Sequence, residues 1–169
     1  MRPEGTPSSH PVIRRAAGAD LANVTSLWTA LLGYHAELDP ALRLRAGTEG
    51  EIHELVRAML ADRDVAVFLG FAVPMQSPRC PSGLCVVRVD RAPPILEEPR
   101  RAQISELYVR EEARRRGLGA ALARAALAHA RELGVRRLEV RVSTRNLAGQ
   151  TFWRALGFRD FMDVLDLRL

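Results

Sequence analysis

A turn rich in arginine and glycine lies at residues 110–117, between a predicted strand and a predicted helix. The N-terminus of a helix exposes backbone N–H groups without partners and carries a partial positive charge, so it is suited to bind an anion. Gly117 and Gly119 have no side chains to keep an anion away from the backbone. Three successive arginines add positive charge that suits a pyrophosphate. We therefore predict that this turn binds a diphosphate.

Two common diphosphate-binding patterns do not fit the turn. A P-loop ends in Gly-Lys followed by Ser or Thr, and the chain contains no lysine. The dinucleotide-binding fingerprint requires a third glycine at the position of Leu122. The pattern Arg114-x-x-Gly117-x-Gly119 instead resembles the Q/R-x-x-G-x-G/A loop of the GNAT acetyltransferase superfamily.

The sequence around this loop extends the resemblance over residues 104–158, and more loosely over residues 12–169. It includes Glu-Leu-Tyr-Val at 106–109 before the loop, an alanine-rich helix after it, Asn146, and Leu-Gly-Phe at 156–158. The resemblance implies an N-acetyltransferase that uses acetyl-coenzyme A as its cosubstrate. It also implies an α/β fold in which helices flank a mixed, mostly antiparallel central sheet whose strands splay apart at the cofactor site.

The resemblance further implies which residues contact the cofactor. The backbone of Leu107, Tyr108 and Val109 is expected to pair with the amides of the pantetheine arm. The pyrophosphate is expected to bind at the turn, to Arg114, Arg115, Arg116, Gly117, Leu118, Gly119 and Ala120. Asn146 matches a position that contacts the cofactor arm, but an asparagine before a helix could equally serve as its cap. Trp153 is expected to pack beside the same arm.

Transfer of an acyl group from a thioester to an amine requires a neutral amine. An alkyl amine has a pKa of about 10, so only about one molecule in a thousand is neutral at pH 7. The resemblance indicates Glu106 as the base; the alternative is that Glu106 forms an ion pair with a nearby arginine. The backbone N–H of Val109 is expected to polarise the acyl carbonyl. Tyr108 shares a strand face with Glu106 by the two-residue period and is a candidate general acid.

Trp153 is the main departure from the family pattern. Many relatives have a tyrosine there, which donates a proton to the departing sulfur, and an indole N–H is too weak an acid for that role. A thiol has a pKa of about 8.5, so its thiolate leaves with less need of a proton than an amine does. An enzyme is therefore the first hypothesis, and a non-catalytic acyl-coenzyme A binding or regulatory module is the second.

The resemblance places the acceptor pocket between the first helices and the loop before the central strand. The residues there are Trp28, Tyr34, His35, Glu37 and Pro93 to Glu98. We interpret Tyr34 and His35 as ordinary surface residues. A small amine, an amino acid and a peptide N-terminus all remain candidate acceptors, whereas the net charge of +5 argues against a polycation.

The composition of the 169 residues fits one domain at 12–169 after a disordered lead-in at 1–11. No apolar run approaches the roughly 20 residues of a membrane helix, and the first residues do not form a signal peptide. We therefore expect a cytoplasmic protein without a membrane partner, and allow for a homodimer.

Arginines occur on every segment without interleaved aromatic residues, so a nucleic-acid partner is a distant third hypothesis. The spacing of histidines and cysteines predicts no metal site and two reduced thiols.

The hydrophobic pattern supplies the elements that position these residues. Apolar runs and alternation predict six strands, at 12–15, 65–73, 84–89, 104–109, 138–142 and 165–169. Apolar residues at helical spacing predict four helices, at 21–32, 48–60, 118–133 and 146–156. The first helix is expected to fade at Gly33, and the second to begin with a capping box formed by Thr48 and Glu51. Residues 93–101 are predicted to form an exposed loop. The order of elements indicates an α/β chain with a mostly antiparallel first half.

Overall fold

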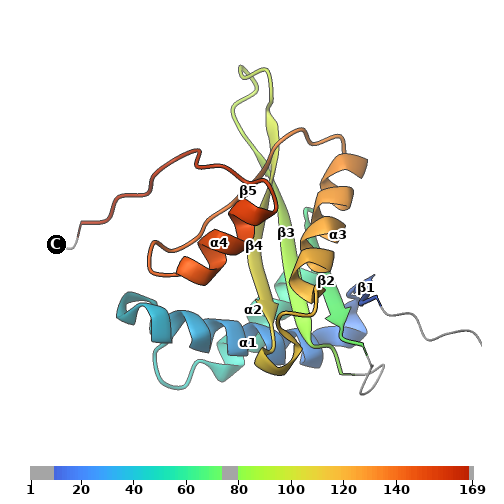
Figure 1. The fold of residues 1–169 in the computed structure, drawn as a ribbon, viewed down its shortest axis with the longest axis vertical. Coiled ribbons are helices and arrows are strands. Elements are labelled where there is room, and N and C mark those ends of the chain that lie inside the picture. Colours follow the sequence, from blue (N-terminus) through green and yellow to red (C-terminus); the bar gives the residue numbers. More distant parts are fainter. Residues whose placement is uncertain (1–9, 74–79, 168–169) are drawn as a thin grey trace, which may run out of the picture.

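A five-stranded sheet forms the centre of the molecule (Figure 1). The computed structural model describes residues 10–73 and 80–167. The strands, in their order across the sheet, are β1 (Val12–Arg15), β2 (Val65–Phe71), β3 (Gly83–Arg91), β4 (Arg100–Val109) and β5 (Leu138–Val140). Neighbouring strands are antiparallel except β4 and β5, which are parallel. The predicted mixed, mostly antiparallel sheet is therefore confirmed.

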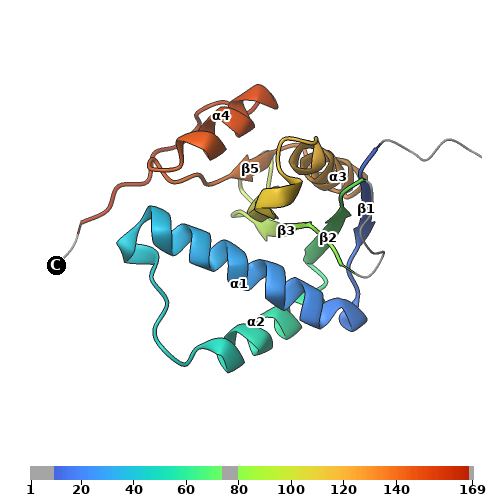
Figure 2. The same ribbon diagram turned by 60° about the horizontal axis from the view of Figure 1, so that its bottom comes forward.

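Helices cover both faces of this sheet. They are α1 (Leu21–Leu38), α2 (Glu49–Ala61), α3 (Leu118–Glu132) and α4 (Leu147–Ala155), with short 3-10 turns η1 (Gly18–Asp20), η2 (Pro40–Leu42) and η3 (Glu111–Ala113). Figure 2 shows α1 and α2 on one side of the sheet and α3 and α4 on the other. The predicted α/β class with flanking helices is thus the observed architecture.

Each face of the sheet buries its own apolar core. Successive side chains of a strand point to opposite faces, so Leu84 and Val86 pack against α1 and α2, while Cys85 and Val87 pack on the side of α3. All four of these side chains are buried. Covering both faces explains why β2 and the start of β3 are continuous apolar runs rather than alternating ones.

Gly70 on β2 allows α3 to approach the sheet closely. A Cβ atom at this position would lie 2.8 Å from Cδ1 of Leu118 and 3.2 Å from Cγ of Leu122. Distances below 3.0 Å require a neighbour to shift. The glycine therefore fixes the first turn of α3 against β2, and with it the position of the arginine-rich turn that precedes the helix.

The first helix is longer than the sequence predicts. α1 continues through Gly33 and ends at Leu38, before Pro40. A glycine inside a helix costs about 1 kcal/mol relative to alanine. Burial of Leu27 and Leu31 on the same helix outweighs that cost, since each buried leucine contributes about 1.5–3 kcal/mol. The extra residues carry Tyr34 and His35 toward the end of the sheet where β4 and β5 lie.

Two boundaries also differ from their predictions. The capping box at the start of α2 is wrong, because the Thr48 hydroxyl donates to the Arg45 carbonyl oxygen at 3.2 Å and forms no cap. Glu51 instead pairs with the Arg45 guanidinium at 2.9 Å, and both side chains are exposed. The loop predicted at 93–101 is shorter, because β4 begins at Arg100 and pairs there with Arg91.

The strand predicted at 165–169 is not present at 165–167, and residues 168–169 lie outside the described part of the chain. Leu165 is 93% exposed and Leu167 is 83% exposed. A strand needs a hydrogen-bonding neighbour, and Figure 1 shows this segment leading away from the sheet. Alternation of apolar residues alone could not show that the partner is missing. Residues 1–9 of the predicted lead-in also lie outside the described residues.

Both cysteines are free, with Cys80 exposed and Cys85 buried, which confirms the prediction of reduced thiols. Burial raises the pKa of the Cys85 thiol, so it stays protonated.

None of the helices within residues 10–73 and 80–167 is long and apolar enough to cross a membrane. The same residues hold no group of three or more His, Cys, Asp or Glu side chains that could bind a metal ion.

A partly buried ion pair joins β1 to the turn before α1. The Arg14 guanidinium donates two hydrogen bonds of 2.7 Å to Asp20, one to each carboxylate oxygen. Oδ2 of Asp20 also accepts the backbone N–H of Ala17 at 2.9 Å. The hydrogen bonds from Arg14 lower the pKa of Asp20 to about 2. This carboxylate therefore stabilises the fold in its charged form.

We expect Asp20→Asn to lower the free energy of unfolding by about 1–2 kcal/mol at neutral pH, because a charge-assisted bidentate pair is lost. The pKa of Asp20 is depressed in the folded state, so its contribution is complete above pH 4 and is lost as the pH falls toward 2. Thermal unfolding at pH 7 and pH 2 should therefore show a difference between wild type and variant that shrinks in acid. Asp160→Asn, which removes an exposed ion pair with Arg154, is the control and should change little at either pH.

Candidate active site

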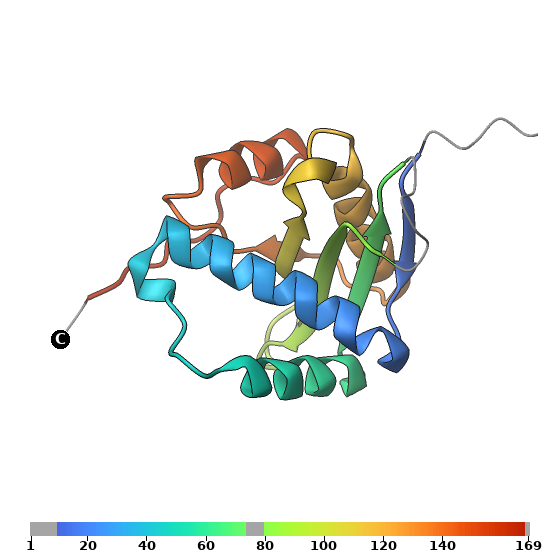
Figure 3. The ribbon, with the colours of Figure 1, turned by 90° about the horizontal axis from the view of Figure 1, so that it is seen from below.

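The parallel strands β4 and β5 separate inside the sheet. They pair only at Ala102–Leu138, Gln103–Glu139 and Ile104–Val140, whereas β4 stays paired with β3 as far as Val109. Figure 3 shows β5 lying beside only one end of β4. The edge of β4 that faces away from β3 therefore has no strand partner beyond Ile104 in the described part of the chain. This is the splayed arrangement that the sequence predicts.

The peptide groups along this free edge can be assigned from the strand pattern. The backbone N–H of Arg110 donates to Ser82 at 2.8 Å, on the β3 side. Peptide groups of a strand point alternately to its two edges, so those of Val109 and Leu107 point into the gap, and that of Tyr108 points to β3. A bulge next to Ser105 places Glu106 opposite Val86. It turns both the Glu106 and Tyr108 side chains to the α1 face, where Tyr108 packs with the core of α1 and α2.

The turn before α3 has the geometry of an anion site. Gly117 has φ +80° and precedes the helix without any side-chain cap, and Arg115 has φ +61°. The first intrahelical bond runs from the Ala121 N–H to the Gly117 carbonyl oxygen. The N–H groups at positions 118–120 precede that bond and are therefore available to a ligand. A Cβ at Gly119 would lie 3.4 Å from the Phe152 ring. The glycine therefore leaves the backbone accessible to an anion, and a large side chain here would contact Phe152.

Arg114 has a different place from the two arginines that follow it. Its Nε donates to the carbonyl oxygen of Val109 at 3.0 Å, so the side chain folds back over the end of β4. Its guanidinium carbon lies 5.5 Å from the ring centroid of Tyr34 and 5.9 Å from that of Tyr108. Arg115 and Arg116 are exposed at the turn. Arg114 thus closes the turn, while the other two supply charge at its surface.

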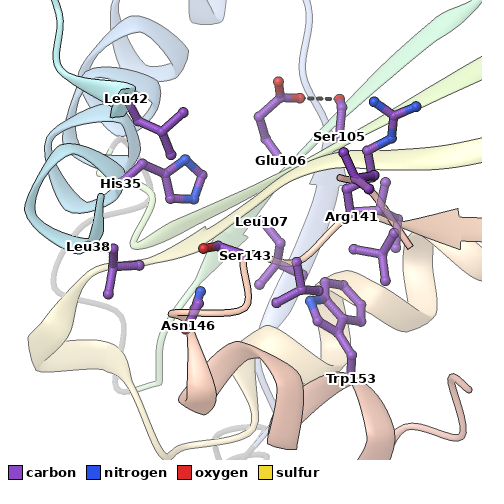
Figure 4. A pocket seen from close by; sticks show the side chains of 14 residues that line it. His35, Leu38, Leu42, Ser105, Glu106, Leu107, Arg141, Ser143, Asn146 and Trp153 are labelled. Carbon is purple, nitrogen blue, oxygen red and sulfur yellow. Dashed lines mark hydrogen bonds between the residues drawn. The ribbon is translucent and has the colours of Figure 1, made fainter. Parts of the chain in front are cut away.

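A pocket of about 350 Å³ opens at the gap between β4 and β5, on the side of α1 (Figure 4). Its lining comes from α1 and η2, from β4, from the end of β5 and the residues after it, and from α4 and the residues after it. The lining residues are His35, Leu38, Leu42, Ile104, Ser105, Glu106, Leu107, Val140, Arg141, Val142, Ser143, Asn146, Trp153 and Val164. The pocket therefore joins the free edge of β4 to the end of α1.

Glu106 is the only carboxylate among the described residues that line the pocket. Burial raises its pKa, while the hydroxyl of Ser105, which donates to Glu106, and the charge of Arg88 act in the opposite direction. The buried indole N–H of Trp28, which has no partner of normal geometry among the described residues, also lowers this pKa. No arginine lies within ion-pair distance of Glu106 in residues 10–73 and 80–167, so the ion-pair alternative is wrong. A carboxylate with a raised pKa is suited to accept a proton near neutral pH.

The end of α1 contributes two half-buried side chains. His35 lines the pocket, and burial lowers its pKa, which favours the neutral imidazole. The Tyr34 hydroxyl donates to Oδ1 of Asn146 at 3.4 Å. The interpretation of His35 as an ordinary surface residue is therefore wrong, while Tyr34 is half-buried but not among the lining residues. The interpretation failed because the sequence indicates a helix end at Gly33, and the helix in fact continues across the pocket.

Other residues expected at the acceptor site lie elsewhere. Glu37 is exposed on α1, and the loop from Pro93 to Glu98 is absent from the pocket lining. That loop precedes β4, which begins at Arg100, six residues before Glu106, and a strand of this length spans about 20 Å. Its Glu98 instead pairs with Arg136 at 3.5 Å. This side of the pocket is therefore lined by α1 and η2 rather than by the loop.

Asn146 and Trp153 both lie on the wall of the pocket formed by α4. Oδ1 of Asn146 accepts the backbone N–H of Gly149 at 2.8 Å, so the helix-cap alternative is confirmed. Trp153 is 7% exposed and makes edge-to-face contacts with Phe152 and Phe158, at centroid distances of 4.9 and 5.1 Å. Its ring is therefore held by the core while one side faces the pocket. Contacts of either residue with a cofactor stay predictions.

Some lining residues were not singled out from the sequence. Arg141 and Ser143 follow β5, while Leu38 and Leu42 flank the junction of α1 and η2. The alternation at 138–142 showed which residues of that strand face the core, and hence that Arg141 points the other way. Nothing in the sequence indicated that this other face would line a pocket with α1.

The chain has the fold of solved acetyltransferases, two of which contain coenzyme A or acetyl-coenzyme A. The model of the acetyltransferase (GNAT) family matches residues 32–158, and the chain belongs to this family. A search of curated protein sequences gives no significant match.

Solved structures share the fold over nearly the whole chain. A tetramutant of the BH1408 protein from Bacillus halodurans has a TM-score of 0.80 at 21% identity, covering 94% of this chain and 99% of its own. The aminoglycoside N-acetyltransferase AAC(6')-Iy in complex with CoA has a TM-score of 0.72 at 19% identity, with coverages of 100% and 99%. A predicted acetyltransferase with acetyl-CoA from Clostridium acetobutylicum has a TM-score of 0.72 at 15% identity, with coverages of 94% and 96%.

We expect Glu106→Gln to stabilise the protein at pH 8. The folded-state pKa of this carboxyl is raised, so the charged form destabilises the fold once the pH passes the unfolded value of about 4.3. At pH 4 the carboxyl is protonated in the fold and the difference from glutamine should nearly vanish. Thermal unfolding should show a rise in Tm of about 2–4 °C for each kcal/mol relieved.

Glu54→Gln, which removes an exposed carboxylate on α2, is the matched control and should not show this pH dependence. An equal effect of Glu106→Gln on Tm at both pH values would contradict the assignment of a buried carboxylate that resists ionisation.

Proposed function

We propose that the protein transfers an acetyl group from acetyl-coenzyme A to a primary amine of a small molecule or peptide. The observation that carries this proposal is a half-buried carboxylate, Glu106, beside the edge of β4 that has no strand partner beyond Ile104 among the described residues. Membership of the acetyltransferase family supports it. Two of the structural neighbours were solved with coenzyme A or acetyl-coenzyme A, which favours the same ligand here.

The residues present fit the cofactor. The peptide groups of Leu107 point into the gap, where they can pair with amides of the pantetheine arm. The Val109 N–H also points there, while the Val109 carbonyl oxygen already accepts a hydrogen bond from Nε of Arg114. The N–H groups at the start of α3, after Gly117, can hold a pyrophosphate, with Arg115 and Arg116 nearby. Asn146 and Trp153 line the same wall of the pocket. When bound, acetyl-coenzyme A supplies an acyl group activated as a thioester.

The side chains at the gap then have distinct parts in the transfer. Glu106 accepts a proton from the amine nitrogen as this nitrogen forms a bond to the acyl carbon and the carbon–sulfur bond breaks. The N–H of Val109, which points into the gap, donates to the carbonyl oxygen where negative charge develops. Tyr108 is on the same face as Glu106 and is our candidate for protonating the sulfur.

A second candidate is a non-catalytic acyl-coenzyme A binding module. It is favoured by Trp153, which occupies the place of the acid in many relatives and is packed into an aromatic cluster. Both candidates predict cofactor binding, and only the first predicts release of free thiol when an amine is added.

Binding of acetyl-coenzyme A tests whether the turn before α3 is the diphosphate site. We expect acetyl-coenzyme A to raise the Tm of wild type, since a ligand at 100 times its Kd stabilises by about 2.7 kcal/mol. Gly119→Asp should abolish the shift, because a carboxylate would repel the pyrophosphate at the helix N-terminus. Gly119→Ala is the matched control: its Cβ is in ordinary contact with Phe152 at 3.4 Å, so it should fold and bind within a few-fold of wild type. Equal binding by the aspartate variant would show that the turn is not the diphosphate site.

Enzyme kinetics test whether Glu106 is the general base. Glu106→Gln should lower kcat/KM at pH 7 by about 10²–10⁴-fold, the usual range for a lost general base. Raising the pH to 9.5 should recover part of the loss, because more of the amine is then neutral without help. The measurement is thiol release over pH 6–10 for both proteins. Parallel pH profiles, or full activity of the variant, would exclude Glu106 as the base.

A further inference from the structure

Arg141 lies on the acceptor face of the sheet rather than on the face of α3. Leu138, Val140 and Val142 pack against the core beneath α3. Side chains alternate along a strand, so Arg141 points to the opposite face, the one that carries Glu106. Arg141, Ser105 and Glu106 all line the pocket (Figure 4), and the Ser105 hydroxyl donates to Glu106. A cation and a carboxylate therefore line the same pocket.

Among residues 10–73 and 80–167, Arg141 has no ion-pair partner that would neutralise it. Arg137, on the same segment, pairs with Glu139 at 3.0 Å, and Arg145 pairs with Asp39 at 3.5 Å. Within residues 10–73 and 80–167, Arg141 forms no ion pair and no side-chain hydrogen bond. An unpaired arginine that lines a pocket is available to a carboxylate or a phosphate of a ligand.

The charge around the pocket opposes a polycationic acceptor. Glu106 is the only carboxylate and Arg141 the only arginine among its described lining residues, and the charge of Arg88 also reaches Glu106. His35 adds a neutral imidazole. An amine with several positive charges would meet one carboxylate and two arginines. An amine that also carries one negative charge would match this arrangement.

The remaining wall is apolar. Leu38 and Leu42 lie on the α1 side of the pocket and Val164 is among its other lining residues. Leu42 is 47% exposed and Val164 is 76% exposed, so this wall is open to solvent until a ligand covers it. An acceptor with an apolar side chain would bury these residues.

We infer that the acceptor is a small zwitterionic amine, an amino acid with an apolar side chain, whose carboxylate binds Arg141 while its amine faces Glu106. This inference rests on the proposed function for its catalytic consequence. The recognition itself is a property of the pocket and can be measured as binding. Recognition by Arg141 would distinguish a free amino acid from a peptide N-terminus. The carboxylate of a peptide lies too far along its chain to reach Arg141 while the terminal amine faces Glu106.

The test uses leucine, leucinamide, 3-methylbutylamine and the polycation kanamycin as acceptors, with thiol release as the readout. We expect leucine to be the best of the four. Arg141→Gln should lower kcat/KM for leucine by about 10- to 100-fold, because a charged hydrogen bond is lost. The same substitution should leave kcat/KM for 3-methylbutylamine within two-fold of wild type, because this amine has no carboxylate. For each amine, kcat/KM of the variant is compared with kcat/KM of wild type, so differences in pKa between the amines do not affect the comparison. Arg141→Lys should keep part of the preference, and Arg57→Gln, which removes the same charge far from the pocket, should behave as wild type.

Equal loss on leucine and 3-methylbutylamine in Arg141→Gln, or a preference for kanamycin or leucinamide, would overturn the inference. If no amine is turned over, the proposed function fails, and leucine binding to the coenzyme A-loaded protein is then measured by calorimetry. Binding of leucine that Arg141→Gln weakens by at least ten-fold would uphold the inference without catalysis, and absence of leucine binding would overturn it. An unchanged thermal shift with acetyl-coenzyme A confirms that each variant is folded.

Discussion

The two edges of β4 are in different environments, and the rest of the molecule is arranged around that difference. One edge is paired with β3 from Arg100 to Val109, while the other is paired with β5 at only three positions. Free peptide groups inside a protein require a partner, so a gap of this kind is stable only where water or a ligand can enter. α1 spans one side of the gap and α4 the other, and the ion pair between Asp39 and Arg145 joins the segments next to them. The pocket is a consequence of a sheet that is left incomplete.

Two carboxylates show how the same chemical group serves stability in one place and reactivity in another. Asp20 accepts two hydrogen bonds from Arg14, and its pKa falls to about 2. Glu106 has no arginine within ion-pair distance among the described residues, and burial raises its pKa. The first is charged throughout the physiological range and stabilises the fold. The second destabilises the fold when charged, which is the condition for a base that readily takes a proton.

Elements with a strong local signal were predictable from the sequence, and features that depend on contacts between distant segments were not. The apolar runs of β2 and β3 and the alanine-rich α3 predicted their own positions. The turn at Gly117 was predictable because a positive φ and an uncapped helix start are local properties. The path of α1 beyond Gly33 depends on packing against the sheet, and the missing last strand depends on whether an edge is available. Arg141 could be placed on a face from alternation, but its pocket arises only when α1 covers that face.

The packing of Trp153 explains how a residue that cannot act as an acid is accommodated beside the pocket. Its ring lies between Phe152 and Phe158, so aromatic contacts fix it without a hydroxyl. The chemistry proposed here has little need for an acid at that position. An amine of pKa about 10 is more basic than a thiolate whose conjugate acid has a pKa of about 8.5. Once Glu106 has taken the proton from nitrogen, the thiolate is the better leaving group, and the carbon–sulfur bond breaks in preference to the new carbon–nitrogen bond. In the proposed reaction the demand on the protein thus falls on removing the amine proton, the role that we propose for Glu106.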